Sequence, residues 1–226
     1  MTGILERLGA VRRGVMFVIE APSGTGKTTV IKKLLEQDKK LNWSVSVTTR
    51  APRDGEQNGV DYYFISDAEY DKLLKEDAFY EHVDSQYGSR YGTLRSEVDG
   101  FLNVGQDVIF DMDWEGLRQM KAKAPDDVVS IYLLPPSIKE LRRRLEGRST
   151  DSKEVIEKRM NLVLEKMQHW TEYDYVVICD NADQTADTIR QIFSAERMKR
   201  VRQLGLVEFT QKLVDEVKNG ETAVCG

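Results

Sequence analysis

Cysteine and histidine are both scarce in this sequence, with two of each among 226 residues. Cys179 and Cys225 are far apart, and neither has neighbours at metal-ligand spacing. The sequence therefore indicates neither a disulfide framework nor a zinc site. So few cysteines fit a reducing compartment, and we expect a cytoplasmic protein.

Long apolar runs and excess positive charge are also missing. No stretch approaches the roughly 18 apolar residues that cross a membrane, and residues 1–13 lack the apolar segment of a signal peptide. The formal net charge is -5, so there is no broad basic field to collect nucleic acid or anionic lipid. We expect neither nucleic acid nor a membrane as a partner, and arginines that bind an anion must act locally.

The remaining composition is that of an ordinary globular protein, with 40% hydrophobic and 31% charged residues and only 5 prolines. Short apolar runs predict buried strands, and apolar residues at helical spacing predict helices between them. Such alternation is typical of a doubly wound α/β core with a largely parallel sheet. The predicted core strands are residues 15–20, 43–47, 108–110, 128–134 and 175–179.

Three segments depart from this alternation. Residues 62–91 hold short aromatic β-type runs around a helix-like stretch near 67–75, which predicts a small mixed lobe inserted into the core. Residues 137–170 carry apolar residues at spacings of three and four, which predict two helices. The end of the chain predicts one more amphipathic helix, which could pack on the core or on a second subunit. A homo-oligomer is therefore one option.

A glycine-rich loop follows the first predicted strand and opens the first helix. Glycines let a loop wrap an anion, N–H groups at the helix start point at it, and a lysine supplies charge, so this pattern predicts a nucleotide phosphate site. The alternative is a turn that merely caps the helix. The strict pattern begins with glycine, whereas this chain has alanine. The residues predicted to bind ATP are Ala21, Pro22, Ser23, Gly24, Thr25, Gly26, Lys27, Thr28 and Thr29.

This loop also predicts Mg²⁺ as the cofactor that accompanies ATP. Lys27 should bridge the β- and γ-phosphates, and the Thr28 hydroxyl should be a metal ligand. Asp111, at the end of an apolar strand, is placed like the acidic residue that holds this metal or its waters; a strand-end cap is the other reading of it.

The stretch from Ser46 to Phe64, SVTTRAPRDGEQNGVDYYF, resembles the nucleotide-monophosphate segment of guanylate kinases. Further matches follow in family order at 79–81, 91–93, 111–113, 145–148 and 158–159, so the resemblance runs from about residue 15 to 193. It implies an α/β fold: a P-loop kinase core with a parallel sheet flanked by helices, an inserted mixed α/β lobe that binds the monophosphate, and a helical lid. The implied activity is transfer of a phosphoryl group from MgATP to GMP, and to dGMP, in purine nucleotide metabolism.

The resemblance also implies an acceptor site. Two arginine forks and two tyrosine hydroxyls suit a phosphate dianion. Guanine offers N1–H and an amino group as donors and O6 as an acceptor, so its pocket needs carboxylates on one edge and hydroxyls on the other. A single arginine or glutamate is more often a surface charge, and a single tyrosine more often a half-buried packing residue. The implied GMP site comprises Ser46, Arg50, Arg53, Tyr62, Glu81, Tyr91, Gly92, Thr93 and Asp113.

Lid arginines are implied on or beside the two helices after Pro136. Arg144, Arg148 and Arg159 would close over the transferring phosphoryl group with Lys27 and exclude water, and Arg148 could instead lie along the adenine. The alternative is an exposed basic helix with no role at the phosphates. At the last strand the family's asparagine is replaced by Cys179, for which we expect a small buried apolar role.

The implied division is a guanylate-kinase-like domain at 14–200 and a helical tail at 201–226. Within the domain the core would comprise 14–45, 98–136 and 171–200, the GMP-binding lobe 46–97 and the lid 137–170. Two alternatives remain open. One is a non-catalytic guanylate-kinase-like module that binds proteins, against which the intact phosphate loop argues, and the other is a kinase for AMP or a pyrimidine nucleotide.

Overall fold

A computed structural model describes residues 12–85, 88–147 and 166–219, together with Glu157, Met160 and Val163. Its centre is a five-stranded sheet in the order β2-β7-β1-β8-β9, in which every neighbouring pair is parallel. The predicted parallel core is therefore confirmed. The strands are β1 (Met16–Glu20), β2 (Leu41–Trp43), β7 (Asp107–Asp111), β8 (Val128–Leu134) and β9 (Tyr175–Ile178).

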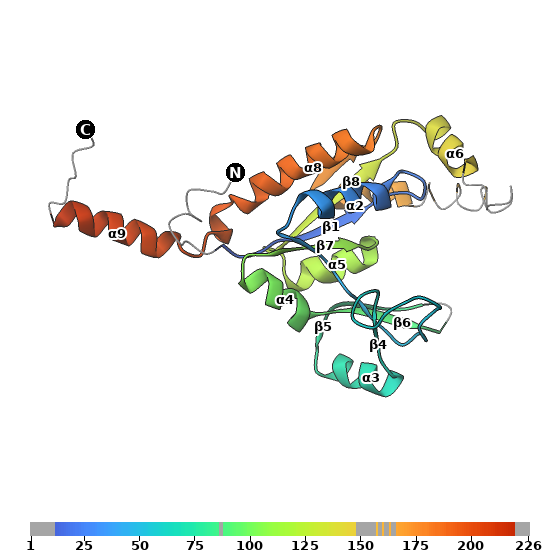
Figure 1. Cartoon of the computed structure of the whole chain (residues 1–226), viewed down its shortest axis with the longest axis horizontal. Helices are drawn as coiled ribbons and strands as arrows, with labels where there is room; N and C mark the ends of the chain where they lie inside the picture. The colour runs from blue at the N-terminus through green and yellow to red at the C-terminus, as the bar shows by residue number, and fades with distance from the viewer. Residues whose placement is uncertain are drawn as a thin grey trace.

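Alternate residues of the central strands enter two different cores, because successive side chains of a strand point to opposite faces. Phe17 and Ile19 pack in a cluster with α2 (Lys27–Gln37) and α8 (Ala182–Arg197). Met16 and Val18 pack on the other face with α4 (Arg95–Asn103) and α5 (Trp114–Lys123). Both faces of the sheet are thus covered by helices, as Figure 1 shows.

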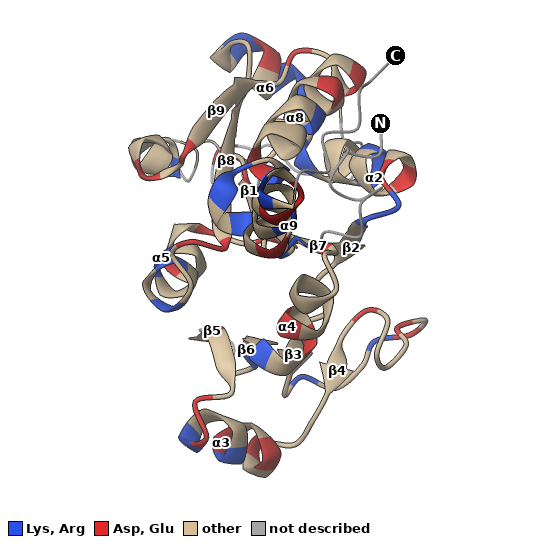
Figure 2. Ribbon diagram, turned by 90° about the vertical axis from the view of Figure 1, so that its left-hand side faces the viewer, with Lys and Arg blue, Asp and Glu red and all other residues tan. Residues whose placement is uncertain are grey.

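A second, mixed sheet lies below the core (Figures 1 and 2). Its order is β4-β3-β6-β5, with β3 and β4 parallel and the other pairs antiparallel. A capping box at Ser66 and Glu69 starts its covering helix, because the side chain of each residue accepts a hydrogen bond from the backbone N–H of the other. The elements are β3 (Val47–Thr48), β4 (Tyr63–Phe64), α3 (Asp67–Lys75), β5 (Phe79–Asp84) and β6 (Arg90–Leu94).

The chain leaves β2 and enters the second sheet within four residues. The single strand predicted at 43–47 is wrong in this respect: β2 ends at Trp43, which pairs with Ile109 of the core, whereas Val47 pairs with Gly92 of the second sheet. The segment between them therefore bridges the two sheets.

The remaining elements follow β8. Helix α6 (Ile138–Glu146) begins at Ser137, whose side chain accepts from the Glu140 backbone. The 3₁₀ turns η1 (Gln168–Glu172) and η2 (Arg200–Arg202) flank β9 and α8. Helix α9 (Leu206–Lys218) projects from the body (Figure 1) and has no buried residue, so packing of this helix on the core is not what the structure shows. A second subunit stays a prediction. Within the described residues, no helix is long and apolar enough to cross a bilayer.

A buried charge network ties the first described residues to the core. Asp107 is fully buried and accepts from both terminal nitrogens of Arg12 at 2.7 and 3.0 Å, from Arg197 Nε at 2.6 Å and from the Val15 amide at 2.9 Å. Arg197 also donates to Asp38 at the end of α2. One carboxylate therefore joins the N-terminal segment, β7 and α8.

We predict that Asp107→Ala lowers the free energy of unfolding by about 3–5 kcal/mol, because it leaves buried guanidinium groups without a partner. Urea denaturation of the wild type and the variant measures this difference. Asp183→Ala is the matched control, because it removes the exposed partner of Lys33 and should change little. Equal midpoints for Asp107→Ala and the wild type would show that the network is not needed for stability.

Candidate active site

The glycine-rich loop connects β1 to α2 at the carboxyl edge of the parallel sheet. Gly24 and Gly26 have φ of 90° and 114°, which favours glycine at both positions. A Cβ on Gly24 would also lie 2.8 Å from a methyl carbon of Leu145 on α6. Gly26 is the N-cap of α2 and makes no side-chain cap bond, which suits a helix start that meets an anion. Ala21 is 5% exposed and packs in the core, so alanine serves at the loop's first position.

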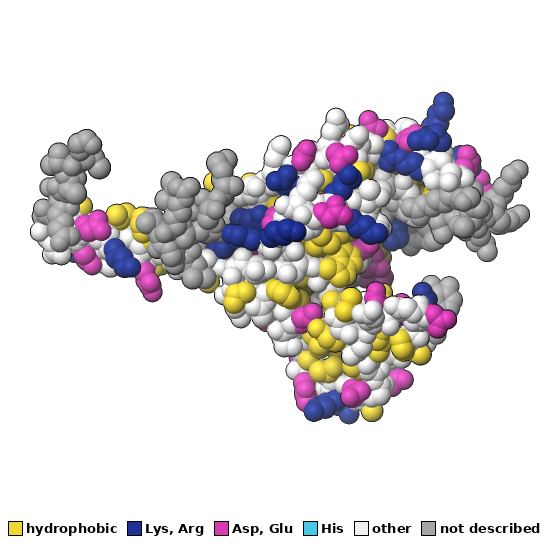
Figure 3. All heavy atoms as spheres, in the orientation of Figure 1, with side chains coloured by type: hydrophobic (Ala, Val, Ile, Leu, Met, Phe, Trp, Pro, Cys, Tyr) yellow, Lys and Arg dark blue, Asp and Glu magenta, His cyan; other side chains and the backbone are white. Residues whose placement is uncertain are grey.

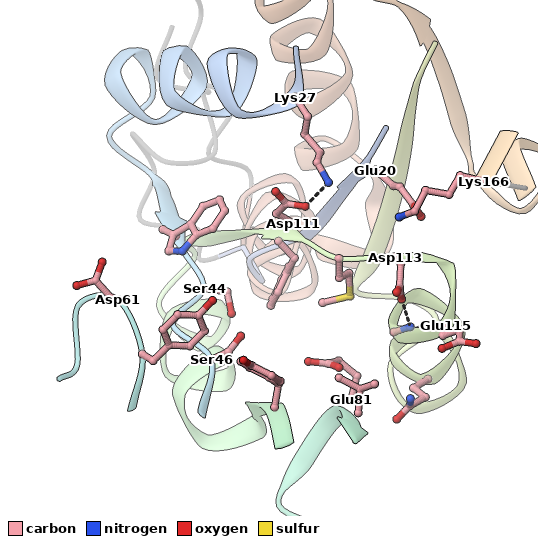
Figure 4. Close-up of a pocket in the computed structure, with 18 residues that line it drawn as sticks. Glu20, Lys27, Ser44, Ser46, Asp61, Glu81, Asp111, Asp113, Glu115 and Lys166 are labelled. Carbon is pink, nitrogen blue, oxygen red and sulfur yellow. Dashed lines mark hydrogen bonds and ion pairs between the residues drawn. The ribbon is translucent and has the colours of Figure 1, made fainter. Parts of the chain in front are cut away.

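Lys27 and Asp111 meet at this edge. The register of β1 and β7 pairs Ile19 with Asp111, so the two strand ends lie side by side. Lys27 donates through Nζ to the Asp111 carboxylate, and both side chains are partly exposed (Figure 4). Thr28 and Thr29 are exposed in the first turn of α2. A cation and a carboxylate therefore lie together where the loop opens, and two exposed threonines follow the lysine in the chain.

A cavity of about 370 Å³ lies between the core and the second sheet. The space-filling view shows the molecule hollowed there (Figure 3), and Figure 4 shows side chains from both parts pointing into it. The cavity brings the phosphate-loop lysine to the same space as residues that are far from it in the chain. The predicted site residues that line it are Lys27, Ser46, Tyr62, Glu81, Tyr91, Asp111 and Asp113.

Glu81 provides a buried carboxylate at the lower end of the cavity. Its side chain is 8% exposed and accepts from Thr93 Oγ1 at 2.7 Å. Burial raises the pKa of Glu81, the Thr93 bond opposes that shift, and the nearby Asp113 carboxylate adds to it. Asp113 caps α5 by accepting from the Gly116 amide at 3.2 Å. Two carboxylates thus face one corner, where each can accept a hydrogen bond from a ligand.

The backbone beside Glu81 is held by close packing. A Cβ on Gly92 would lie 2.8 Å from the Phe79 ring and 3.2 Å from the Glu81 carbonyl oxygen, so only glycine fits there. Close packing therefore explains why position 92 is a glycine. Ser46 lies at the start of β3 and faces the cavity from the opposite side (Figure 4).

The predicted phosphate clamp is partly assembled. The Arg50 guanidinium carbon lies 5.3 Å from the centre of the Tyr62 ring, and Tyr62 meets Tyr91 edge to face. Arg50 donates two bonds of 2.9 Å to Glu56, which also accepts from the Arg53 amide at 2.7 Å. The bonds from Arg50 lower the pKa of Glu56 to about 2. Glu56, which the sequence reasoning missed, thus holds the Arg50 side chain and the Arg53 backbone.

Arg144 is bound to backbone rather than exposed to the cavity. Its guanidinium donates to the carbonyl oxygens of Thr25 at 2.8 Å, Cys179 at 3.2 Å and Asp180 at 2.9 Å, and its Nε donates to Glu140. In this conformation it joins α6 to the phosphate loop and to the end of β9. Arg148 and Arg159 lie outside the described residues. Cys179 is 2% exposed in the core, as its predicted apolar role requires.

Four further charged residues line the cavity without having been predicted as site residues, namely Glu20, Asp61, Glu115 and Lys166, and two of them form an ion pair. Glu20 is the last residue of β1 and is 1% exposed, and Lys166 Nζ lies 3.2 Å from its Oε1. Glu20 escaped notice because it closes an apolar strand, and Lys166 because it lies far from it in the sequence. Their 146-residue separation is a tertiary contact that no local pattern signals.

The family model described as "Guanylate kinase" matches residues 13–196, which is most of the chain. This chain belongs to the guanylate kinase family. The match spans both sheets and the cavity between them, so it covers the whole site. The resemblance inferred from the sequence is therefore confirmed, and the P-loop kinase core and the mixed second sheet are those of the family.

Individual members of the guanylate kinase family agree closely with the whole chain. The guanylate kinases of Novosphingobium aromaticivorans and Zymomonas mobilis are both 47% identical to it over 203 and 205 residues, covering 90% of this chain and 91% and 94% of theirs. The crystal structure of the guanylate kinase from Anaplasma phagocytophilum superposes with a TM-score of 0.69 at 34% identity, over 90% of this chain and 96% of that one.

We predict that Glu81→Gln raises the KM for GMP about 10- to 100-fold and leaves the KM for ATP nearly unchanged, because one charged hydrogen bond is lost at the base end. Initial rates with each substrate varied in turn measure both constants. Because the pKa of Glu81 is raised, the wild-type KM for GMP should also increase as the pH falls towards that pKa, since a protonated carboxyl group accepts the hydrogen bonds of guanine less well. Equal increases in both KM values would count against a role for Glu81 at the base.

Proposed function

We propose that this enzyme transfers the terminal phosphoryl group of MgATP to GMP, and to dGMP, forming ADP and the nucleoside diphosphate. One observation carries the proposal. A single cavity joins the Lys27–Asp111 pair at the phosphate loop to the Glu81–Asp113 pair at the second sheet. The first pair suits the phosphates of a nucleotide, and the second suits the donor edge of guanine.

The acceptor nucleotide would lie across the cavity with its base at the lower end. Glu81 and Asp113 would accept from N1–H and the amino group, and the Ser46 hydroxyl would donate to O6. The Thr93 hydroxyl, which donates to Glu81 in the described conformation, would have to turn away from Glu81 to donate to O6 as well. Adenine presents the opposite pattern and would leave those groups unpaired. The phosphate of GMP would accept hydrogen bonds from Arg50, Arg53, Tyr62 and Tyr91, and Gly92 would allow close approach of the backbone.

No general base is needed for this reaction. The second pKa of a phosphate monoester is about 6, so the accepting oxygen is largely ionised at neutral pH. It attacks the γ-phosphorus in line, and the bond to the bridging oxygen breaks so that ADP leaves with the electron pair. The protein's part is to position the two nucleotides and to stabilise the charge on the transferring group with Lys27.

Mg²⁺ fits the oxygen ligands at the mouth of the loop. Thr28 is exposed in the first turn of α2, Asp111 lines the cavity, and Mg²⁺ commonly takes one or two protein oxygens, substrate phosphates and waters. The described residues hold no group of three or more His, Cys, Asp or Glu that could bind a metal by themselves. When bound, it would neutralise phosphate charge.

The domain division is part of the proposal. Residues 46–97 would act as the GMP-binding lobe and residues 137–170 as a lid that carries Arg144, Arg148 and Arg159 towards the phosphates. In the described conformation Arg144 is bound to the Thr25 carbonyl, so such a movement would have to release it. Because ATP and nucleoside monophosphates are cytoplasmic metabolites, we also propose a cytoplasmic location.

A coupled assay of ADP formation tests the function, with GMP, dGMP, AMP, UMP, CMP and dTMP each offered as acceptor to MgATP. Turnover confined to GMP and dGMP is expected. Turnover with another acceptor would retain the kinase and overturn the guanine site, and no turnover from folded protein would favour a binding module.

We predict that Lys27→Ala lowers kcat about 100- to 1000-fold, because one preorganised donor to the transferring phosphoryl group is lost. The same coupled assay measures the rate. Thermal unfolding should hardly change, since the ion pair with Asp111 is partly exposed. A variant that keeps wild-type kcat would refute the assignment of the phosphate loop.

A further inference from the structure

Glu20 is a buried charge that the proposed mechanism does not use. It is 1% exposed, although it lines the cavity at the end of β1. Its two oxygens are bound by different partners: Oε1 lies 3.2 Å from Lys166 Nζ, and Oε2 accepts from the Tyr173 hydroxyl. Burial and the adjacent Glu20 carboxylate raise the pKa of Tyr173, so its hydroxyl stays protonated and donates.

A carboxylate at this place needs a reason. Removing a charge from water is unfavourable, and an ion pair in a protein interior is often no better for stability than apolar residues of similar size. Glu20 also lies directly before the phosphate loop, where a negative charge would repel a nucleotide unless it is neutralised. Stability alone therefore does not account for the pair.

Lys166 pairs with the Glu20 carboxylate and presents its ammonium group to the cavity. Its side chain is 39% exposed, so its ammonium group can bind Glu20 and still be reached from the cavity. Lys27 reaches towards Asp111 from α2, whereas Lys166 reaches towards Glu20 from the opposite side, two residues before η1 (Figure 4). The other charged groups at this end of the cavity are the carboxylates of Asp111, Asp113 and Glu115. A second cation opposite Lys27 offsets part of their repulsion of a phosphate.

We propose that Lys166 is a second phosphate-facing cation of the transfer site, and that Glu20 is its positioning residue. The inference rests on the proposed function. Lys166 forms and breaks no bond in the reaction; it stabilises the negative charge of the transferring phosphoryl group, while Tyr173 and Glu20 hold its ammonium at the cavity wall.

Four variants test this assignment in the coupled assay with MgATP and GMP. Lys166→Met should lower kcat roughly 100-fold, with KM values for both nucleotides changed by less than about threefold. Lys166→Arg should recover part of the rate, because it keeps the charge. Glu20→Gln should lower kcat about tenfold, since the ammonium group is no longer held. Glu20→Gln with Lys166→Met should match Lys166→Met alone, because Glu20 acts through Lys166.

The double variant keeps the test decisive if Lys166→Met is unstable, because it leaves no unpaired carboxylate buried at position 20. Wild-type kcat in the double variant would overturn the proposal and leave a structural ion pair. Lys121→Met is the control: Lys121 is similarly exposed and pairs with Asp174 at 3.0 Å, but it does not line the cavity, so its kcat should equal that of the wild type. Turnover of GMP by the wild type in the same plates tests the proposed function separately.

Discussion

The position of β1 between β7 and β8 determines where the groups of the site lie. Parallel pairing sets Ile19 beside Asp111 and Glu20 beside Tyr132, so the ends of three strands share one edge. The loop that leaves β1 can then start α2 only above that edge, which puts Lys27 against Asp111. The alternation of β1 sends Glu20 to the opposite face from α2, towards α5 and η1. Two cations therefore approach one cavity from two faces of the same strand.

Pairing with a carboxylate is shared by the cations of the cavity and its rim. Lys27 binds Asp111, Arg50 binds Glu56 and Lys166 binds Glu20. Each pair holds a long side chain in place before a phosphate arrives, which reduces the ordering that binding would otherwise require. Arg144 also pairs with a carboxylate, that of Glu140, but its remaining donors are used by backbone carbonyls of the loop and of the residues that follow β9. It therefore stabilises the loop in this conformation, and a role at the phosphates would need α6 to move.

Much of the fold was predictable from local pattern. The helix at 67–75 has the predicted bounds because a capping box defines its start, and β8 has the predicted bounds because an apolar run ends at two prolines. Helix α4 was missed: it is nine residues long, and its N-cap residue, Leu94, has no side chain that can cap it. The strand predicted at 43–47 failed because its two halves pair in different sheets, and pairing partners are not visible in a strand's own sequence.

Some residues of the site could likewise be predicted from the sequence, and others could not. Ser46, Tyr62, Glu81, Tyr91 and Asp113 could be predicted because they lie in segments that match the family, and the structure brings them to one cavity. Glu20 and Lys166 could not be predicted as site residues, because they are brought together only by a contact between distant parts of the chain. Glu56 could have been found by asking which residue near Arg50 and Arg53 holds them, since a loop with two arginines needs a counter-charge.

We propose that the cavity recognises guanine through the carboxylates of Glu81 in the second sheet and of Asp113 at the start of α5. Isothermal titration of the wild-type protein with GMP and with AMP, each without ATP, tests it most directly. The account predicts that GMP binds with measurable heat, that AMP at the same concentration does not, and that the preference is lost in Glu81→Gln. Equal affinities for GMP and AMP in the wild type would contradict it.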